Sequence, residues 1–239
     1  MGSRERLDGL LALSLGLSRR QARALVREGL VTAGGKIARD PAYKPEPAEL
    51  IGCPGRSFTA AEILRRRVFM LNKPAGCVCA DRDGRHPAVA SLFAGEPRSA
   101  ELHCVGRLDL DTRGLLLVTD DGDLSHSVTA PRRGIAKRYL AAVRRPLRQS
   151  DVALFGAGLR HPGERKPYAP AVLEILSPTE ARVTVTEGRF HEVKRLFECV
   201  GNELVALKRL SVGALRLDEG LPSGCYRRLS EEEIAAIFA

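Results

Sequence analysis

Two carboxylates and two arginines lie together in one segment near the middle of the chain, bounded by glycines. The segment reads GRLDLDTRG from Gly106 to Gly114 and contains Asp109 and Asp111. A carboxylate held in a closed site can attack an electrophilic carbon or accept a proton. Two carboxylates that flank a glycosidic bond could instead hydrolyse it, as in a glycosidase. An Asp-rich loop can also be a solvated turn, so the sequence around the loop is needed to distinguish a catalytic site from a solvated turn.

A short apolar strand has to hold this segment in place. Residues 115–119 are Leu-Leu-Leu-Val-Thr, and Asp120-Asp121-Gly122 follows them. A short apolar run that ends in a turn signal is typical of a buried strand. Charged residues on a loop that a rigid strand anchors are where proteins commonly hold catalytic side chains, so the sequence predicts a functional site here.

The full run GRLDLDTRGLLLVTDDG resembles the signature of the bacterial ribosomal pseudouridine synthases. That signature consists of GRLD, two variable residues, Thr or Ser, any residue, Gly and an apolar strand. The resemblance implies that Asp109 is the catalytic aspartate. It also makes Arg107 a candidate RNA-binding residue that occupies the space left by the extracted base, while a phosphate contact or a structural role stays open for the same side chain.

Three further segments carry the same resemblance. Leu-Asn-Lys-Pro-Ala-Gly at 71–76 is similar to the first family motif, and Lys73 within it is expected to contact RNA or to have a structural role. Tyr139, in a K-x-Y pattern, matches the tyrosine that stacks on the target base, although a half-buried strand tyrosine is the commoner case. The run HEVKR at 191–195 resembles the third motif, whose basic residue, here Lys194, pairs with the aspartate.

The reaction that the resemblance implies breaks the bond from ribose C1′ to uracil N1 and joins C1′ to C5 instead. There is no redox change and nothing leaves, so no cofactor is expected. Asp109 would attack the sugar or take a sugar proton, and the sequence leaves both possibilities open. Lys194 would keep that carboxylate ionised against the effect of burial. Tyr139 would stack on the ring near C5, after the base has been extracted at a cost of a few kcal/mol.

The first part of the chain has the pattern of an RNA-binding module. Residues 4–17 carry leucines at helical spacing, and Ser18 with Gln21 forms the capping box of a second helix that ends near Glu28. Four arginines lie on the surface of that second helix: Arg19, Arg20, Arg23 and Arg27. The run SRRQARALVREGLVTAGGKI resembles the S4-type RNA-binding module, in which these arginines would grip phosphates, although by themselves they would also suit a solvated face.

The charge balance also favours nucleic acid as a partner. Lys and Arg outnumber Asp and Glu by 38 to 29, a net charge of +9. An excess of this size favours a polyanion, nucleic acid before membrane. No apolar run is long enough for a membrane span and no leader pattern opens the chain, so a cytoplasmic protein is expected. The six cysteines are scattered without a C-x-x-C pair, which is typical of reduced thiols, and no metal site is expected.

We therefore expect an α+β chain with a small S4-like RNA-binding domain at 1–60 and a pseudouridine synthase domain at 65–239, with a linker within 40–67. The second domain should be built on a mostly antiparallel mixed sheet. The run TDDGDLSHSVTAP, followed by K-x-Y-L, most resembles the family members that act on the small subunit. That resemblance implies an enzyme that isomerises one uridine of 16S (small-subunit) rRNA, free or in an assembling small subunit, and a monomer is expected. The alternatives are the same reaction on 23S (large-subunit) rRNA and a non-catalytic RNA-binding protein of ribosome assembly that has kept the fold.

Overall fold

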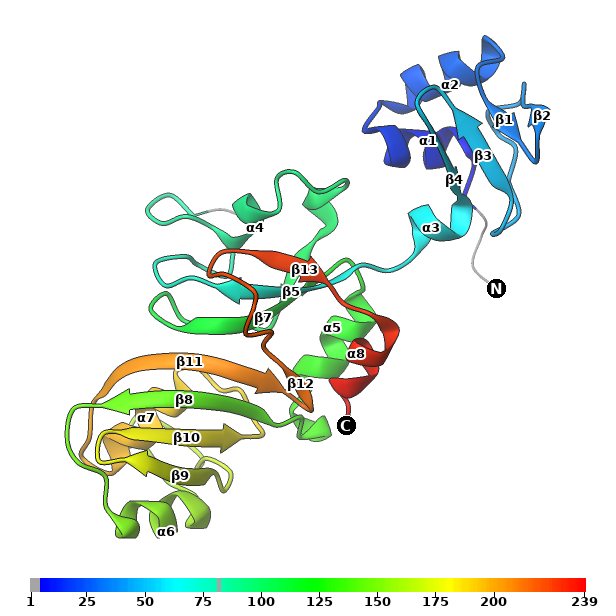
Figure 1. Ribbon diagram of the computed structural model, residues 1–239. Coiled ribbons are helices and arrows are strands. Elements are labelled where there is room, and N and C mark those ends of the chain that lie inside the picture. Colours follow the sequence, from blue (N-terminus) through cyan, green and yellow to red (C-terminus); the bar gives the residue numbers. More distant parts are fainter. Residues whose placement is uncertain (1–4, 81–82) are drawn as a thin grey trace. The chain divides into compact units, whose positions relative to one another are not determined.

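The computed structural model describes residues 5–80 and 83–239 and divides them into two compact units (Figure 1). The smaller unit comprises the described residues up to Arg66 together with Gly95–Ser99. The larger unit comprises the described residues of Arg67–Ala94 and Ala100–Ala239. In the described part of the chain, no helix has both the length and the apolar character that crossing a membrane would require.

The smaller unit packs two helices and a short third one against a four-stranded antiparallel sheet with the order β2-β1-β3-β4. Its elements are α1 (Leu7–Leu15), α2 (Arg19–Arg27), β1 (Thr32–Ala33), β2 (Lys36–Ile37), β3 (Leu50–Cys53), β4 (Arg56–Thr59) and α3 (Ala60–Leu64). The predicted capping box is present, because Ser18 and Gln21 cap α2 reciprocally. The core joins leucines of α1 to Val26 of α2 and to Ile51 and Phe58 of the sheet.

The expectation that residues 40–67 form a linker was wrong from Leu50 to Leu64, where β3, β4 and α3 lie. Strands β3 and β4 pair with each other from Leu50 to Thr59, and β3 also pairs with β1. Ile51 and Phe58 point from these strands into the core and are almost fully buried. Four prolines and two glycines in this segment favour a linker by sequence, but Pro54 and Gly55 form the turn between β3 and β4, and Gly52 lies within β3.

The larger unit is built on a mixed sheet with the order β13-β5-β7-β11-β8-β10-β9, with β6 beside β7 and β12 beside β11. Its strands are β5 (Val68–Lys73), β6 (His103–Val105), β7 (Arg113–Thr119), β8 (Lys137–Val143), β9 (Val172–Ser177), β10 (Glu180–Val185), β11 (Leu204–Val212), β12 (Leu215–Arg216) and β13 (Tyr226–Arg228). Among these strands only β7 and β11 pair in parallel. The mostly antiparallel mixed sheet and the α+β fold class are therefore confirmed.

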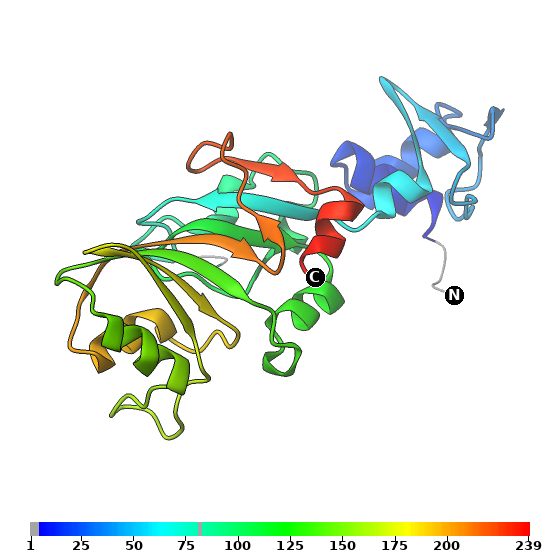
Figure 2. The same cartoon turned by 60° about the horizontal axis from the view of Figure 1, so that its bottom comes forward.

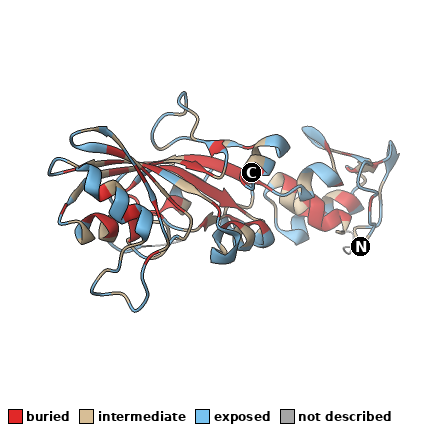
Figure 3. Cartoon of the chain, turned by 90° about the horizontal axis from the view of Figure 1, so that it is seen from below, coloured by how far each residue is buried: buried red, intermediate tan, exposed pale blue. Residues whose placement is uncertain are grey.

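Helices cover both faces of this sheet. The helices are α4 (Val89–Leu92), α5 (Gly122–Thr129), α6 (Gln149–Ala157), α7 (Glu192–Cys199) and α8 (Glu231–Ala236). Phe155 of α6 and Phe197 of α7 pack with Leu116 of β7 in one core, on the side where Figure 2 shows both helices. Leu115, the neighbour of Leu116, packs with α5 and α8 in a second core. Because side chains alternate along a strand, β7 contributes to both cores and its residues are almost all buried (Figure 3).

Lys73, the last residue of β5, holds the loop that leads into β7. Its side chain is completely buried, and Nζ donates to the carbonyl oxygens of Pro74 at 3.0 Å, Asp109 at 3.1 Å and Thr112 at 3.0 Å. The expectation that Lys73 contacts RNA was therefore wrong. An ammonium has three donors, and here all three are used inside the protein, so the structural alternative applies.

A second constraint acts where the loop enters β7. Gly114 has φ +100° and lies opposite Arg209 in the parallel pairing of β7 with β11. A Cβ at this position would lie 2.3 Å from the carbonyl oxygen of Arg209 and 2.8 Å from its nitrogen. Only glycine accepts both this backbone conformation and this close approach.

Replacement of Lys73 by methionine should lower the free energy of unfolding by about 3 kcal/mol, because three buried carbonyl groups lose their donor. Urea denaturation followed by circular dichroism measures the change. Lys166→Met is the matched control, since Lys166 is an exposed lysine of the same unit. Equal stability of the two variants would contradict the structural role of Lys73.

Gly114→Ala should be destabilised by about 3 kcal/mol or more, because a left-handed backbone strain adds to a clash with backbone atoms. Gly122→Ala serves as its control: Gly122 begins α5 and has open space at its Cβ position, so its unfolding midpoint should hardly move. If Gly114→Ala is as stable as this control, β7 and β11 can move apart without lowering the free energy of unfolding.

Candidate active site

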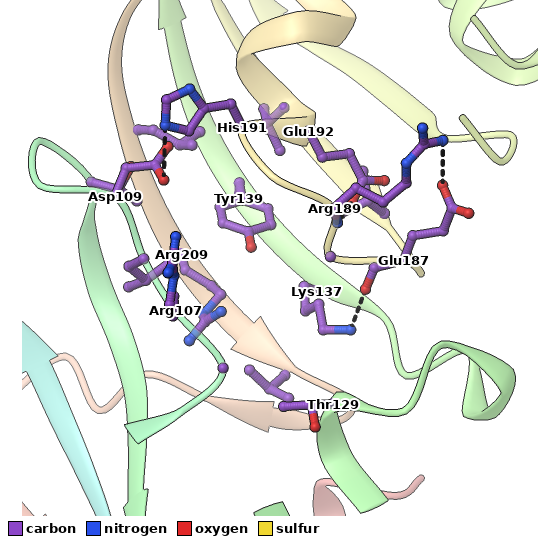
Figure 4. A pocket seen from close by; sticks show the side chains of 18 of the residues that line it. Arg107, Asp109, Thr129, Lys137, Tyr139, Glu187, Arg189, His191, Glu192 and Arg209 are labelled. Carbon is purple, nitrogen blue, oxygen red and sulfur yellow. Dashed lines mark hydrogen bonds and ion pairs between the residues drawn. The ribbon is translucent and has the colours of Figure 1, made fainter. Parts of the chain in front are cut away.

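A cavity of about 150 Å³ opens in the larger unit beside the loop that precedes β7 (Figure 4). Its walls come from that loop, from β8 and β11, from the turn at 187–189 and from the start of α7. Four of the site residues expected from the sequence line it: Arg107, Asp109, Tyr139 and Lys194. The fold thus gathers residues that are far apart in the chain around one space.

The carboxylate of Asp109 meets a different nitrogen at each of its oxygens. Oδ2 lies 3.3 Å from Nζ of Lys194, and Oδ1 lies 3.5 Å from Nε2 of His191, which faces it in Figure 4. The side chain is 26% exposed, so it is shielded from bulk water yet open to the cavity. Its backbone is fixed by the hydrogen bond from Lys73 and by a turn in which the N–H of Thr112 donates to the Asp109 carbonyl.

Lys194 pairs more closely with Asp111 than with Asp109. Its Nζ lies 2.8 and 2.9 Å from the two carboxylate oxygens of Asp111. Burial by itself would lower the pKa of Lys194, but the hydrogen bond from Lys194 to Asp111 and the charges of both carboxylates together raise it. Burial would raise the pKa of Asp111, and the hydrogen bond and charge of Lys194 lower it overall. The ammonium is therefore a stable cation shared by two carboxylates, a sharing that the sequence did not indicate.

Tyr139 lies on β8 and forms part of the cavity wall. The residue is 8% exposed and packs with the core that contains Leu116 and Phe197. In Figure 4 its ring stands between Asp109 on one side and Lys137 on the other. The expected alternative, a half-buried strand tyrosine with its hydroxyl at the surface, does not describe this ring, which borders the cavity.

Two cations of the cavity were missed by the sequence analysis. Arg209 of β11 is 4% exposed and donates from Nε to the carbonyl oxygen of Leu115 at 2.6 Å. Lys137 of β8 donates to the carbonyl oxygen of Glu187 at 2.7 Å, and burial, then the charge of Arg209, lowers its pKa. One weak sequence signal for Arg209 was available. This residue occupies a buried position of an alternating strand, where a charged side chain is rare and often has a functional or structural role.

The turn at the cavity rim is tied to a neighbouring loop by charges. Arg189 pairs with Glu164 and also donates to the carbonyl oxygens of Lys166 and Pro167. Glu192 accepts a hydrogen bond from the N–H of Arg189 at 2.9 Å, and burial raises the pKa of this carboxyl group. These contacts give the rim a defined shape next to Lys137 and Arg209.

The four arginines predicted to contact phosphates are all exposed on α2 of the smaller unit, but two of them have partners within the protein. Arg23 pairs at 2.7 Å with Asp8, whose side chain is fully buried, and Arg19 pairs at 3.1 Å with Glu5. Within the described ranges, Arg20 and Arg27 make no ion pair. These two side chains have their guanidinium groups available for a phosphate.

Comparisons with known proteins identify the family of each domain. The family model described as RNA pseudouridylate synthase matches residues 67–199, and the S4 domain model matches residues 5–51. A relative from Salmonella typhimurium, named ribosomal small subunit pseudouridine synthase A, is 43% identical over 97% of this chain and 99% of its own length. The protein of the same name from Vibrio cholerae is 39% identical over 98% of this chain and 99% of its own.

A solved structure supports the same assignment over the whole chain. The crystal structure of a pseudouridylate synthase matches with 38% identity and a TM-score of 0.69, covering 97% of this chain and 99% of the other. Sequence, fold and the residues around the cavity therefore lead to one conclusion: the chain belongs to the RNA pseudouridylate synthase family, and it is an RNA-acting isomerase that combines an S4 domain with the synthase domain.

Proposed function

We propose that this enzyme converts one specific uridine of 16S rRNA to pseudouridine, with Asp109 as the catalytic carboxylate. The observation that carries the proposal is the setting of Asp109, whose two oxygens meet Lys194 and His191 at the edge of a cavity bordered by Tyr139. Positive or donating groups at both oxygens direct a carboxylate, as a nucleophile or base has to be directed.

The chemistry can be assigned to the side chains of the cavity. Asp109 attacks C1′ of the ribose or removes a sugar proton, and the C1′–N1 bond breaks. The uracil then turns and C1′ joins C5, as the bond from Asp109 to C1′ breaks or the proton returns to the sugar. The proton at C5 leaves and N1 gains a proton, so Asp109 is regenerated and the product is an isomer of the substrate. The ring of Tyr139 stacks on the uracil and holds C5 near the sugar. Arg107, exposed at the cavity, fills the position of the extracted base.

Two further cations of the cavity suit the uracil itself. Lys137 and Arg209 line the same cavity as Tyr139 and bring N–H donors to its inner wall. A uracil ring has two carbonyl oxygens that accept hydrogen bonds and gain negative charge while the ring is detached from the sugar. Cations in a site with little water stabilise such charge strongly. We therefore assign to them the binding of the detached base.

The small-subunit substrate is supported by the names of the relatives, which are ribosomal small subunit pseudouridine synthases. The same reaction on 23S rRNA is the second candidate, because the catalytic residues do not distinguish the two RNAs. A non-catalytic assembly protein is disfavoured, since the acidic, aromatic and basic residues that the reaction needs are all present around one cavity. With a ribosomal substrate, we also propose a cytoplasmic enzyme that works as a monomer.

Asp109→Ala should abolish pseudouridine formation and change the affinity for RNA by no more than about a few-fold, because a single carboxylate is lost from a large basic surface. Purified wild-type and variant proteins are incubated with unmodified small- and large-subunit rRNA. Pseudouridines are then located by chemical labelling and primer extension. Asp123→Ala, which removes an exposed carboxylate from α5, should retain wild-type activity.

One new site in small-subunit rRNA with the wild type, absent with Asp109→Ala, supports both the substrate and the residue. A site only in large-subunit rRNA supports the second candidate, and a variant that still makes pseudouridine refutes the role of Asp109. If the wild type modifies neither RNA, the same mapping on a partly assembled small subunit separates a particle substrate from the non-catalytic alternative.

Joint replacement of Arg20 and Arg27 by glutamine should flatten the slope of log K against log salt by about 1.4 to 1.8, at about 0.7–0.9 per lost phosphate contact. Filter binding of the full chain to small-subunit rRNA over a range of salt concentrations measures this. Arg19 and Arg23 are left in place, because they balance Glu5 and the buried Asp8 and their loss would disturb the fold.

The control variant replaces Arg144 and Arg182 of the larger unit by glutamine, which removes the same net charge. These two arginines form exposed ion pairs with Glu203 and Glu174. The salt slope of this control should stay near that of the wild type. A slope for the Arg20 and Arg27 variant that equals the wild-type value would show that this face of α2 is only solvated.

A further inference from the structure

His191 reaches the catalytic carboxylate from the side opposite Lys194. Its Nε2 is 3.5 Å from Oδ1 of Asp109, whereas Lys194 approaches Oδ2. Lys194 has shorter contacts with Asp111, at 2.8 and 2.9 Å, so its flexible side chain is directed mainly toward that neighbour. The rotation of the Asp109 carboxylate about its last bond is therefore set by Lys194 only in part, since such a terminal torsion has broad minima.

The backbone of His191 is unusual in the described part of the chain. The residue has φ +53° and ψ +28°, a left-handed conformation, directly before the first residue of α7. Apart from glycines, Arg98 is the other described residue with positive φ. L-residues avoid this region, and where they occupy it, the surrounding structure imposes it, often beside a functional site. Here this conformation accompanies an imidazole that reaches the loop of Asp109.

The orientation of the imidazole is fixed by a ring contact. The rings of Phe190 and His191 stack with centroids 3.8 Å apart and planes inclined by 17°. Phe190 is 56% exposed, so core packing does not explain its position, and the guanidinium of Arg195 lies 5.4 Å from its ring centroid. The stacking covers one face of the imidazole with the ring of Phe190, and the ring edge that carries Nε2 points toward Asp109.

The groups around His191 define its role as a donor. The loop before β7 presents the carboxylates of Asp109 and Asp111, and α7 presents Lys194 and, across Phe190, Arg195. A carboxylate only accepts hydrogen bonds, so the 3.5 Å contact can become a hydrogen bond only when Nε2 of His191 carries a proton. The same donor is available from a neutral or a protonated imidazole, which makes the contact independent of the charge on His191.

We propose that His191 is a positioning residue for the reaction: its Nε2–H group donates to Oδ1 of Asp109 and sets the rotation of the carboxylate toward the sugar of the bound uridine. The inference rests on the proposed catalytic role of Asp109. A reacting atom has to be held close to its attack geometry, and a small misdirection can slow a reaction strongly. With donors at both oxygens, the carboxylate has one preferred orientation before RNA enters.

Two replacements of His191 separate a donor from a merely structural residue. Glutamine carries its amide nitrogen at the same number of bonds from Cα as imidazole Nε2, whereas asparagine ends one bond short of it. Asparagine accepts the left-handed conformation well, so His191→Asn keeps the backbone and removes the donor. Single-turnover rates and RNA dissociation constants are measured for both full-length variants and the wild type, on the rRNA that the wild type modifies.

His191→Asn should lower the single-turnover rate constant by about 10- to 100-fold, the range expected for a lost hydrogen bond to a charged group. Its RNA dissociation constant should stay within about 3-fold of the wild type, because the contact is made inside the protein. His191→Gln should recover most of the rate. A wild-type rate in His191→Asn overturns the proposal, and so does an equal loss in both variants when both are folded by circular dichroism.

A second measurement keeps this test separate from the proposed function. The imidazole ¹⁵N resonances of the full chain without RNA are recorded for the wild type and for Asp109→Asn, and His191→Asn identifies the signal of His191. The Nε2 resonance of His191 should shift when Asp109 is replaced. An unmoved resonance would overturn the contact, whereas a failure of the wild type to make any pseudouridine would overturn the proposed function and leave this result standing.

Discussion

The position of the loop that carries Asp109 depends on the place where β7 and β11 pair. At Gly114 the two backbones approach so closely that a Cβ would lie 2.3 Å from the carbonyl oxygen of Arg209. This pairing puts the loop of Asp109, at the start of β7, beside β11, and β8, which carries Tyr139, pairs with the other edge of β11. A strand order that is not the chain order thus creates the site. Lys73 completes the constraint by binding the loop carbonyls from inside the core.

The electrostatics of the site follow from an excess of positive groups around few carboxylates. Asp109 and Asp111 share Lys194, while Lys137 and Arg209 stand on the inner wall without a carboxylate at hydrogen-bonding distance in the described structure. Both inner cations are held by backbone carbonyl groups, which orient them without neutralising them. Under the proposed function, Asp109 is the anionic group for the chemistry, and Lys137 and Arg209 are available for an electron-rich ring or a phosphate.

The smaller unit uses its arginines in two ways. Asp8 is fully buried on α1, and Arg6 and Arg23 pair with it. Burial would raise the pKa of Asp8, but the hydrogen bonds and charges of these arginines lower it overall. Removing one partner from a buried charge is expensive, so Arg23 belongs to the fold as much as to any RNA contact. Arg20 and Arg27, on the same helix, pair with no carboxylate in the described structure. The sequence does not distinguish these two arginines from Arg19 and Arg23.

Local patterns in the sequence were sufficient for several elements and for four of the residues that line the cavity. The apolar run at 115–119 and the capping box at Ser18 each reflect interactions between residues that are near in the chain, and β7 and α2 lie where these patterns placed them. Asp109 and Tyr139 were identified because they belong to short motifs whose residues are contiguous.

What the sequence alone determined about this protein is therefore its family, its α+β class and the residue types that the reaction needs. Tertiary structure decided which of these side chains reach the cavity and which partners they have. The side chain of Lys73 is buried, because the end of β5 lies next to the loop that carries Asp109. Lys194 pairs with Asp111 as well as with Asp109. Arg209 lines the cavity from β11, a strand that no sequence motif marks. Such contacts join residues distant in the chain, and they depend on strand order and on backbone spacing, which no local pattern records.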